Sequence, residues 1–466
     1  MTAFSMRDVV ESTGARLLHG DPRRPLLGVS TDTRTLRPSD LFLALNGPNF
    51  DGNLFAAQAL ERGASGVLLR DNGTTAEQLR RIPESAAVAV HDSPRQALSA
   101  LAAWHRRRLD IPVVGVTGSC GKTTTKNILI ELLGESRDVV GSPASFNNDI
   151  GVPHTLLLAD ERTEVLVVEM GTNAPGEIEA LCRTARPNCG IITNVGASHL
   201  AGLGSVEGVA REKGALAASL PLDGFCVLNA DCRHTRLLAS MTRARVITFS
   251  VDGPGDLDAR DVWFHPGGTT FRLNGGHEVT SPLLGLHSVQ NLLAALAACV
   301  GLGLDLEEVL PAVSRLRAER RRMERIEVGG LTLFDDSYNA NPESARASVR
   351  VLAGLHGHAR RVLVLGDMLE LGEFAAELHH EVGRLAASSG IDLLLLVGEL
   401  TRATAAGALE AGLAPEHVVH FEDPEAALGL VPGLVREGDV VLIKASRRLA
   451  LERLVDRIRA LPSRAI

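Results

Sequence analysis

The chain has 466 residues, of which 45% are hydrophobic and 22% charged, so it is an ordinary globular protein too long for one hydrophobic core. Its net charge of −8 excludes a global basic field that would attract nucleic acid or an anionic membrane surface. The longest apolar runs fall far short of the roughly 20 residues of a membrane-spanning helix. The six cysteines lack Cys-x-x-Cys and zinc spacing, and we expect them to be reduced in a cytoplasmic protein.

The first hundred residues contain short apolar runs broken by turn residues. Residues 41–45 and 66–69 are predicted strands, and residues 56–62 and 93–108 are predicted helices. Because Pro112 ends helical structure, we place the end of the first domain, residues 1–109, just before it.

Strands and helices alternate in the second domain, residues 110–316. The predicted strands are residues 113–116, 165–169, 190–193 and 225–228, and the predicted helices include residues 122–133 and 288–300. Such alternation indicates a parallel sheet covered by helices on both faces.

A charged connector, residues 315–325, leads into the third domain, residues 317–466. Arg320, Arg321 and Arg322 in a row suggest an exposed hinge. Predicted strands at 331–334, 361–365, 393–397 and 440–443, with a helix at 403–413, repeat the alternation. The predicted fold class is therefore α/β in three domains: a central P-loop-type parallel sheet with flanking helices and a C-terminal Rossmann-like α/β domain.

The segment from Thr117 to Thr125, TGSCGKTTT, has the composition of a phosphate-binding loop. It lies between a predicted strand and a predicted helix, whose N-terminus directs free N–H groups at a phosphate. Lys122 would reach the β- and γ-phosphates, and the Thr123 hydroxyl would bind Mg²⁺. Val116 breaks the strict P-loop pattern, and the alternative is a tight turn with an incidental lysine. We expect Cys120 to be a passive small residue rather than a nucleophile.

Two further residues follow strands of the same predicted sheet. Glu169 ends one strand and His199 lies one loop beyond the next, so both are expected at the carboxyl edge, where open α/β sheets bind ligands. A carboxylate there suits magnesium. Lys213, taken alone, has the pattern of a solvated helix lysine.

Five segments resemble the Mur ligase family in order and spacing: TGSCGKTTT and residues 145–153, 169–171, 194–200 and 285–291. These enzymes add amino acids to the cytoplasmic peptidoglycan precursor. Residues 335–344 and 364–373 resemble the members that add D-alanyl-D-alanine. The resemblance runs from about Ser30 to Leu454. Asn53, Ala215, Arg321 and Ala445 depart from the family pattern.

The resemblance implies a role for each matching residue. The catalytic residues would be Lys122, Lys213 and His199. Two magnesium ions would be held by Thr123, Glu169, His199 and Lys213, the last of them carbamylated. ATP would contact Gly118, Ser119, Cys120, Gly121, Lys122, Thr123, Thr124, Asn291, Arg322, Asp336 and Asn339. The UDP-linked precursor would contact Ser30, Thr31, Arg34, Asn46, Gly47, Asn147 and Asn148.

The resemblance also implies a reaction. ATP would phosphorylate the carboxylate of a UDP-N-acetylmuramoyl-tripeptide, and the amine of D-alanyl-D-alanine would attack the acyl phosphate. The N-terminal domain would bind the UDP end, and the C-terminal domain would bind the dipeptide and close over ATP. We expect a cytoplasmic monomer without nucleic-acid or membrane partners.

Three other functions stay open. The first is the preceding ligase of the pathway, which adds the third amino acid, although the Asp-Asn-Pro-Arg motif is missing. The second is a P-loop NTPase that acts as a switch. The third is a non-catalytic descendant, although Lys122, Glu169 and His199 are all present.

Overall fold

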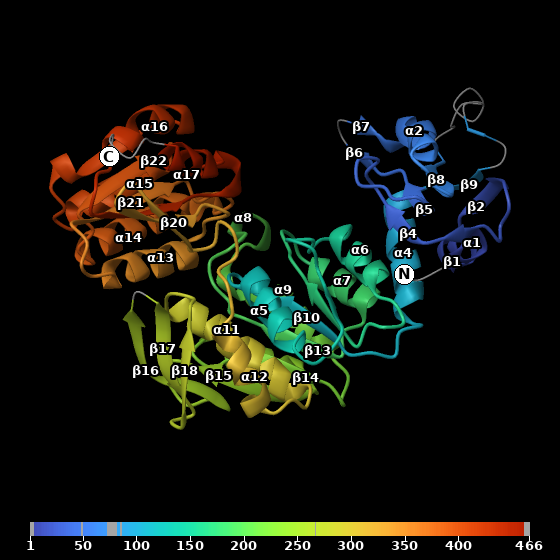
Figure 1. Ribbon diagram of the computed structural model, residues 1–466, viewed down its shortest axis with the longest axis horizontal. Helices are drawn as coiled ribbons and strands as arrows, with labels where there is room; N and C mark the ends of the chain where they lie inside the picture. The colour runs from blue at the N-terminus through green and yellow to red at the C-terminus, as the bar shows by residue number, and fades with distance from the viewer. Residues whose placement is uncertain (1–3, 48–49, 72–81, 84–85, 266, 461–466) are drawn as a thin grey trace.

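The computed structural model describes residues 4–47, 50–71, 82–83, 86–265 and 267–460. They form three lobes, each built on its own main β-sheet (Figure 1). Pro48 and Asn49, which follow the predicted precursor contacts Asn46 and Gly47, lie outside the described residues.

The N-terminal lobe contains a five-stranded sheet in the order β2-β9-β8-β5-β4, in which only the β2–β9 pair is antiparallel. Its strands are β2 (Arg16–His19), β4 (Gly28–Ser30), β5 (Asp40–Leu43), β8 (Gly66–Arg70) and β9 (Ala87–His91). Helices α1 (Met6–Thr13) and α4 (Pro94–Arg106) share one hydrophobic core with the sheet, and α2 (Ala56–Glu61) lies in the other. Short strands pair beside it: β1 (Phe4–Ser5) with β3 (Pro25–Leu26), and β6 (Asn46–Gly47) with β7 (Phe50–Asp51).

The central lobe contains a nine-stranded sheet in the order β11-β12-β10-β13-β14-β15-β16-β17-β18. Its strands are β10 (Val113–Thr117), β11 (Val139–Gly141), β12 (Val165–Glu169), β13 (Cys189–Ile192), β14 (Phe225–Asn229), β15 (Arg245–Ser250), β16 (Leu257–His265), β17 (Gly268–Leu273) and β18 (His277–Ser281). The expected parallel arrangement holds from β11 to β16, but β17 and β18 extend the sheet in antiparallel fashion. A local signal for that hairpin is Asn274 and Gly275, both at positive φ in its turn.

Helices cover both faces of the parallel part of this sheet. Along β12, Val165 and Val167 point into one core and Leu166 and Val168 into the other, as the two-residue period of a strand requires. The first core is closed by α5 (Lys122–Leu133), α11 (Leu286–Gly301) and α12 (Leu306–Val313), and the second by α6 (Gly151–Leu158), α7 (Glu177–Ala185), α9 (Val206–Ser219) and α10 (Thr235–Met241).

The C-terminal lobe is a doubly wound α/β unit, as expected. Its six strands run β19-β20-β24-β21-β22-β23, and only β19–β20 is antiparallel. They are β19 (Glu324–Val328), β20 (Leu331–Asp336), β21 (Arg360–Gly366), β22 (Leu393–Val397), β23 (Val418–Phe421) and β24 (Asp439–Lys444). One face carries α13 (Pro342–Gly354), α14 (Ala375–Ser388) and α15 (Thr401–Glu410), and the other carries α16 (Pro424–Leu430) and α17 (Glu452–Arg459).

One expectation about the connector was wrong, and a second holds only for one of its three arginines. Strand β19 begins at Glu324, before the expected first strand of this lobe, because an antiparallel edge strand precedes β20. Arg320 is exposed, but the side chains of Arg321 and Arg322 are only 29% and 22% exposed. Arg321 pairs with Glu452 of the C-terminal lobe, and Arg322 reaches Thr123 of the central lobe. The hinge itself stays a prediction. The boundaries at 109/110 and 316/317 stay predictions.

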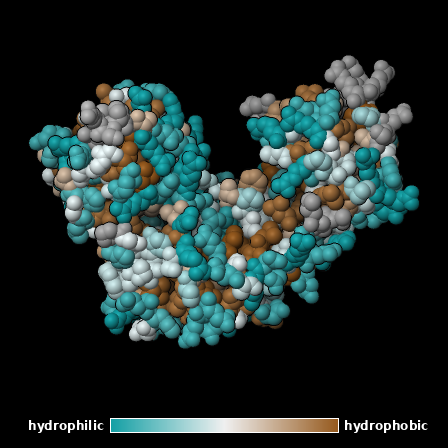
Figure 2. Space-filling model, in the orientation of Figure 1, coloured by the Kyte–Doolittle hydropathy of each residue, from teal (hydrophilic) through white to brown (hydrophobic). Residues whose placement is uncertain are grey.

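A hollow separates the N-terminal and C-terminal lobes above the central lobe (Figure 2). The short helix α8 (Leu200–Leu203) lies where the central lobe meets the C-terminal one (Figure 1). All six cysteines are free, and four of them are buried. Among the described residues, no helix combines the length and apolar character needed to cross a membrane.

Candidate active site

One cavity of about 2350 Å³ is lined by residues of all three lobes. It gathers most of the predicted site residues: Ser119, Cys120, Gly121, Lys122, Thr123, Thr124, Asn147, Asn148, Glu169, His199, Asn291, Arg322, Asp336 and Asn339. Gly118 and Lys213 lie outside this lining, as do Ser30, Thr31, Arg34, Asn46 and Gly47 of the N-terminal lobe.

The predicted phosphate-binding loop connects β10 to α5. Gly118 and Gly121 take φ values of 151° and 82°, which favour glycine, and a Cβ on either would overlap Thr193 or Asn291 respectively. Helix α5 begins at Lys122 without a side-chain cap among the described residues, so its first N–H groups stay free to bind an anion. Lys122 Nζ folds back and donates to Gly118 O over 2.8 Å. The loop therefore has the backbone geometry of a phosphate cradle.

Lys213 is not the solvated lysine that its local pattern suggests. It lies on α9 with 1% exposure and makes no hydrogen bond or ion pair within the part of the chain that the structure describes. Burial, followed by repulsion from Lys122, lowers the pKa of Lys213 to about 7. A large fraction of Lys213 is therefore neutral at physiological pH. Burial also lowers the pKa of Lys122.

Glu169 presents one free carboxylate oxygen at the end of β12. The residue is 1% exposed, and its Oε1 accepts from Asn147 Nδ2 over 2.8 Å. Its Oε2 is buried without a hydrogen-bond partner among the described residues. The Lys126 ammonium lies 3.9 Å from this oxygen, too far for a hydrogen bond, so Oε2 can still bind a cation.

Lys126 forms a buried ion pair with Glu169. Its ammonium donates to Ser142 O over 2.7 Å and to Ala144 O over 2.6 Å, and it lies 3.9 Å from Glu169 Oε2. Only 1% of Lys126 is exposed. The loop that carries Asn147 is thereby tied to α5. Sequence reasoning gave Lys126 no role, although it directly follows the threonines of the loop.

His199 precedes α8 and takes the left-handed φ of 52°. Its Nδ1 lies 2.7 Å from Oε2 of Glu370, in the loop after β21. Burial lowers the pKa of His199, with Lys122 acting in the same direction and Glu370 opposing them. His199 is therefore neutral at physiological pH, the form that binds metal ions.

The residues expected to hold magnesium fit such a cation only when a further ligand joins them. Across the described ranges, no group of three or more His, Cys, Asp or Glu side chains could hold a metal ion. Glu169 and His199 both line the cavity, with the Thr123 hydroxyl beside Lys122. Glu169 is the only anionic ligand among these three, so a second would have to come from a modified Lys213 or from ATP itself.

Arg322 crosses from the C-terminal lobe to the phosphate-binding loop. It donates to Thr123 Oγ1 over 3.0 Å, and its guanidinium lies 4.1 Å from the centre of the Tyr338 ring. The Tyr338 hydroxyl donates to Ser145 Oγ over 2.6 Å. Arg322 and Tyr338 thus join the two lobes beside the predicted magnesium ligand Thr123.

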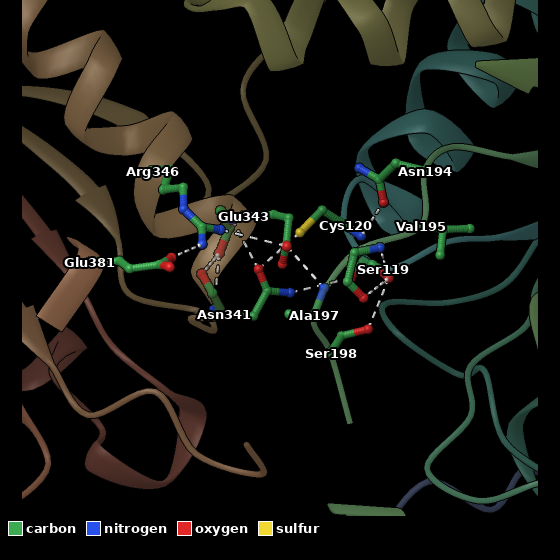
Figure 3. Close-up of polar contacts among 12 residues, drawn as sticks. Ser119, Cys120, Asn194, Val195, Ala197, Ser198, Asn341, Glu343, Arg346 and Glu381 are labelled. Carbon is green, nitrogen blue, oxygen red and sulfur yellow. Dashed lines mark hydrogen bonds and ion pairs between the residues drawn. The ribbon is translucent and has the colours of Figure 1, made fainter. Parts of the chain in front are cut away.

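The N-terminus of α13 docks against the same loop (Figure 3). Its N-cap residue Asn341 accepts from Cys120 Sγ over 3.0 Å, and its amide donates to Ser119 O over 3.4 Å. Glu343 Oε1 accepts from Ala197 N over 2.9 Å (Figure 3). Cys120 therefore packs as a small residue at the contact between lobes, and burial raises its thiol pKa, which keeps it protonated.

Asp336 and Asn339 occupy the C-terminal wall of the cavity. Asp336 Oδ2 accepts from Lys444 Nζ and from Ser348 Oγ, both over 2.7 Å. Lys444 also donates to Asn339 O over 3.0 Å. Lys444 joins Asp336 to the backbone of Asn339, so these two predicted ATP contacts form one rigid unit.

The predicted precursor contacts are bonded mainly to their own neighbourhoods, and Thr31 contacts α6. Thr31 is within 3.2 Å of His154 in α6, and Arg34 pairs with Asp32, which lowers the Asp32 pKa to about 2. Asn148 Oδ1 accepts the N–H groups of residues 150 and 151 at the start of α6. Ser30 Oγ donates to a backbone carbonyl, Asn46 to Asp51, and Gly47 lies in the β6–β7 pair.

Sequence models of one family match most of the chain. Those described as "Mur ligase family, catalytic domain", "Mur ligase middle domain" and "Mur ligase, glutamate ligase domain" match residues 26–106, 116–299 and 321–447. The chain is 37% identical to the UDP-N-acetylmuramoyl-tripeptide–D-alanyl-D-alanine ligase of Bacillus subtilis, with 92% of each chain covered. It is also 37% identical to the enzyme of that name from Escherichia coli, again over 92% of each chain.

Solved structures agree with the sequence relatives. MurF from Acinetobacter baumannii superposes with a TM-score of 0.89 at 27% identity, covering 99% of this chain and 100% of that one. MurF ligase from Thermotoga maritima, solved in complex with ADP, has a TM-score of 0.79 at 27% identity, covering 93% and 97%. With its three lobes, its phosphate-binding loop and these relatives, the chain belongs to the Mur ligase family.

Proposed function

We propose that this chain joins D-alanyl-D-alanine to UDP-N-acetylmuramoyl-tripeptide with the hydrolysis of ATP to ADP and phosphate. The observation that carries the proposal is the cavity in which Lys122, Glu169 and His199 of the central lobe meet Tyr338 and Asn341 of the C-terminal lobe. The relatives from Bacillus subtilis and Escherichia coli, which align with 92% of the chain, are named for this reaction.

The reaction proceeds in two balanced steps. A carboxylate oxygen of the tripeptide attacks the γ-phosphorus, the bond to ADP breaks, and an acyl phosphate forms. The amine of D-alanyl-D-alanine then attacks the acyl carbon, loses a proton, and phosphate leaves with the electrons of the C–O bond. Lys122 and the free N–H groups of α5 stabilise charge on the transferring phosphoryl group. The chain needs no covalent nucleophile, which agrees with the protonated state of Cys120.

Thr123, Glu169, His199 and a carbamylated Lys213 would hold two magnesium ions, which would neutralise phosphate charge when bound. The Oε2 of Glu169, which has no hydrogen bond among the described residues, and the neutral ring of His199 support this assignment. The neutral amine of Lys213 attacks CO₂, a C–N bond forms, and one proton leaves to give a carbamate. A pKa of about 7 supplies that neutral amine.

The remaining assignments extend the proposal to partners and location. The other predicted ATP contacts are Gly118, Ser119, Gly121, Thr124, Asn291, Arg322, Asp336 and Asn339, and Ser30, Thr31, Arg34, Asn46, Gly47, Asn147 and Asn148 are the predicted precursor contacts. We also propose a monomer that works in the cytoplasm.

The test supplies purified protein with ATP, Mg²⁺, D-alanyl-D-alanine, and tripeptide precursor carrying lysine or diaminopimelate in separate reactions. Phosphate is measured by a coupled assay, and the pentapeptide by mass spectrometry. We expect equal amounts of both products and little phosphate when the dipeptide is left out. Phosphate release without pentapeptide would contradict the ligase assignment and favour an NTPase. Amide formation with a UDP-linked dipeptide and a free amino acid would instead favour the preceding ligase.

A further inference from the structure

Two residues in left-handed backbone conformations face each other across the contact between the central and C-terminal lobes. They are His199, with a φ of 52°, and Glu370, with a φ of 65°. Non-glycine residues take such values at an energetic cost, and they concentrate at functional sites. Glu370 Oε2 lies 2.7 Å from His199 Nδ1, and Glu370 O accepts from Ala201 N over 3.4 Å. Glu370 therefore contacts both His199 and the first turn of α8.

The contact determines which ring nitrogen of His199 is free. A carboxylate beside Nδ1 favours a proton on that nitrogen, which leaves the lone pair on Nε2. Histidines that bind metals usually donate their other N–H to a carboxylate or carbonyl, which fixes the tautomer and the ring orientation. Glu370 Oε2 is at ion-pair distance from His199 Nδ1 but outside hydrogen-bond angles, and a rotation of the exposed Glu370 carboxylate would complete this arrangement.

The carboxylate comes from a different lobe than the histidine. Glu370 follows β21 of the C-terminal lobe, whereas His199 follows β13 of the central lobe. Glu343 of the C-terminal lobe also accepts from Ala197 N, two residues before His199 (Figure 3). The segment 197–201 is thus contacted at Ala197, His199 and Ala201 by one partner lobe.

We propose that Glu370 is a positioning residue that orients His199 for metal binding only while the C-terminal lobe is docked. This inference rests on the proposed metal site. Docking and metal binding are then coupled, and the coupling is reciprocal: docking raises metal affinity, and bound metal favours docking. The C-terminal lobe thereby completes the metal site as well as bringing the acceptor amine.

The experiment measures Mn²⁺ affinity by electron paramagnetic resonance on the full chain with ADP present, and the Mg²⁺ dependence of ligation. We expect Glu370→Ala to weaken Mn²⁺ binding by about 10-fold, the low end for such partners, because 63% of the Glu370 side chain is exposed. Glu370→Gln keeps an acceptor oxygen and should recover part of the loss. Activity of Glu370→Ala should return towards the wild-type kcat at saturating Mg²⁺.

Glu373→Ala is the matched control, because this exposed glutamate lies three residues further along the same segment. It should bind Mn²⁺ as the wild type does, and all variants should unfold at the wild-type temperature. Glu343→Ala tests whether docking of the C-terminal lobe is coupled to metal binding. Glu343 contacts no predicted metal ligand, yet its loss should also weaken Mn²⁺ binding.

The outcomes separate the two proposals. Wild-type affinity in Glu370→Ala would overturn this inference while the metal site stands. Wild-type affinity in Glu343→Ala together with a loss in Glu370→Ala would overturn the coupling to docking. A wild-type chain without any saturable Mn²⁺ site would overturn the proposed metal site, and this inference with it.

Discussion

Tyr338 offers a direct test of the contact between lobes, because it is the only tyrosine in the chain. Its hydroxyl donates to Ser145 Oγ over 2.6 Å, while its ring lies under the Arg322 guanidinium. Tyr338→Phe removes the hydrogen bond and keeps the ring. A bond of this kind contributes about 0.5–1.5 kcal/mol net. At 1.4 kcal/mol per factor of ten, the docking equilibrium should fall by about 2- to 12-fold.

The assay is kcat/KM for pentapeptide formation in a double-mutant cycle with Ser145→Ala. If the docked state is required for the reaction, each single variant loses about 2- to 12-fold, and the double variant loses no more than the larger single effect. Effects that multiply in the double variant would mean that the two side chains act separately. Full activity of Tyr338→Phe would refute the role of this bond in docking.

Three further predictions concern the central lobe. Lys126→Met leaves the buried Ser142 carbonyl and the partly buried Ala144 carbonyl without their donor. It should lower the free energy of unfolding by about 1–3 kcal/mol, measured in urea against the exposed control Arg211→Met. The free energy of unfolding of the wild type, relative to that of Lys213→Met, should rise by about 1 kcal/mol per pH unit between about pH 7 and 9 in CO₂-free buffer. In that window the lysine of the unfolded chain binds more protons than the buried lysine of the folded chain. In Gly196→Ala, the new Cβ would lie 2.5 Å from Glu343 Cδ and should reduce kcat/KM by about 10-fold, whereas adding Glu343→Ala should give the activity of Glu343→Ala alone.

Each of these predictions has a contrary result. Equal stability of Lys126→Met and Arg211→Met would mean that water satisfies the two carbonyls. Parallel stability profiles of the wild type and Lys213→Met would mean that Lys213 keeps its proton in the folded protein. A double variant less active than Glu343→Ala alone would mean that Gly196 matters for a reason other than its contact with Glu343.

The parts of the site that are contiguous in sequence could be predicted from it. The phosphate-binding loop has its glycines, lysine and threonines in one run, and helix α5 begins and ends where the apolar pattern places it. Glu169 could be placed because a buried strand ends at that residue. These features depend on backbone conformation and on the period of buried residues, both of which are local properties.

The contacts between lobes could not be predicted in this way. Tyr338 and Ser145 are 193 residues apart, and Glu343 and Ala197 are 146 apart. Their meeting depends on the relative placement of two separately folded sheets, which no local pattern records. The local pattern around Lys213 could not show its burial either, because separate elements cover its helix: α7, α10 and the central sheet.

The composition of the contact between lobes explains how the enzyme could both open and protect its intermediate. Polar contacts dominate near the loop, and the apolar contacts are in two places. Leu200 and Leu203 of α8 pack near Phe374, and Leu284 of the central lobe joins the core beside α13. Interfaces of that kind between domains open and close readily. An acyl phosphate is lost if water reaches it, so phosphoryl transfer is productive only in the closed cavity. Since Arg322 and Glu370 reach Thr123 and His199 only through docking, the groups that promote the transfer are assembled by the same movement that excludes water.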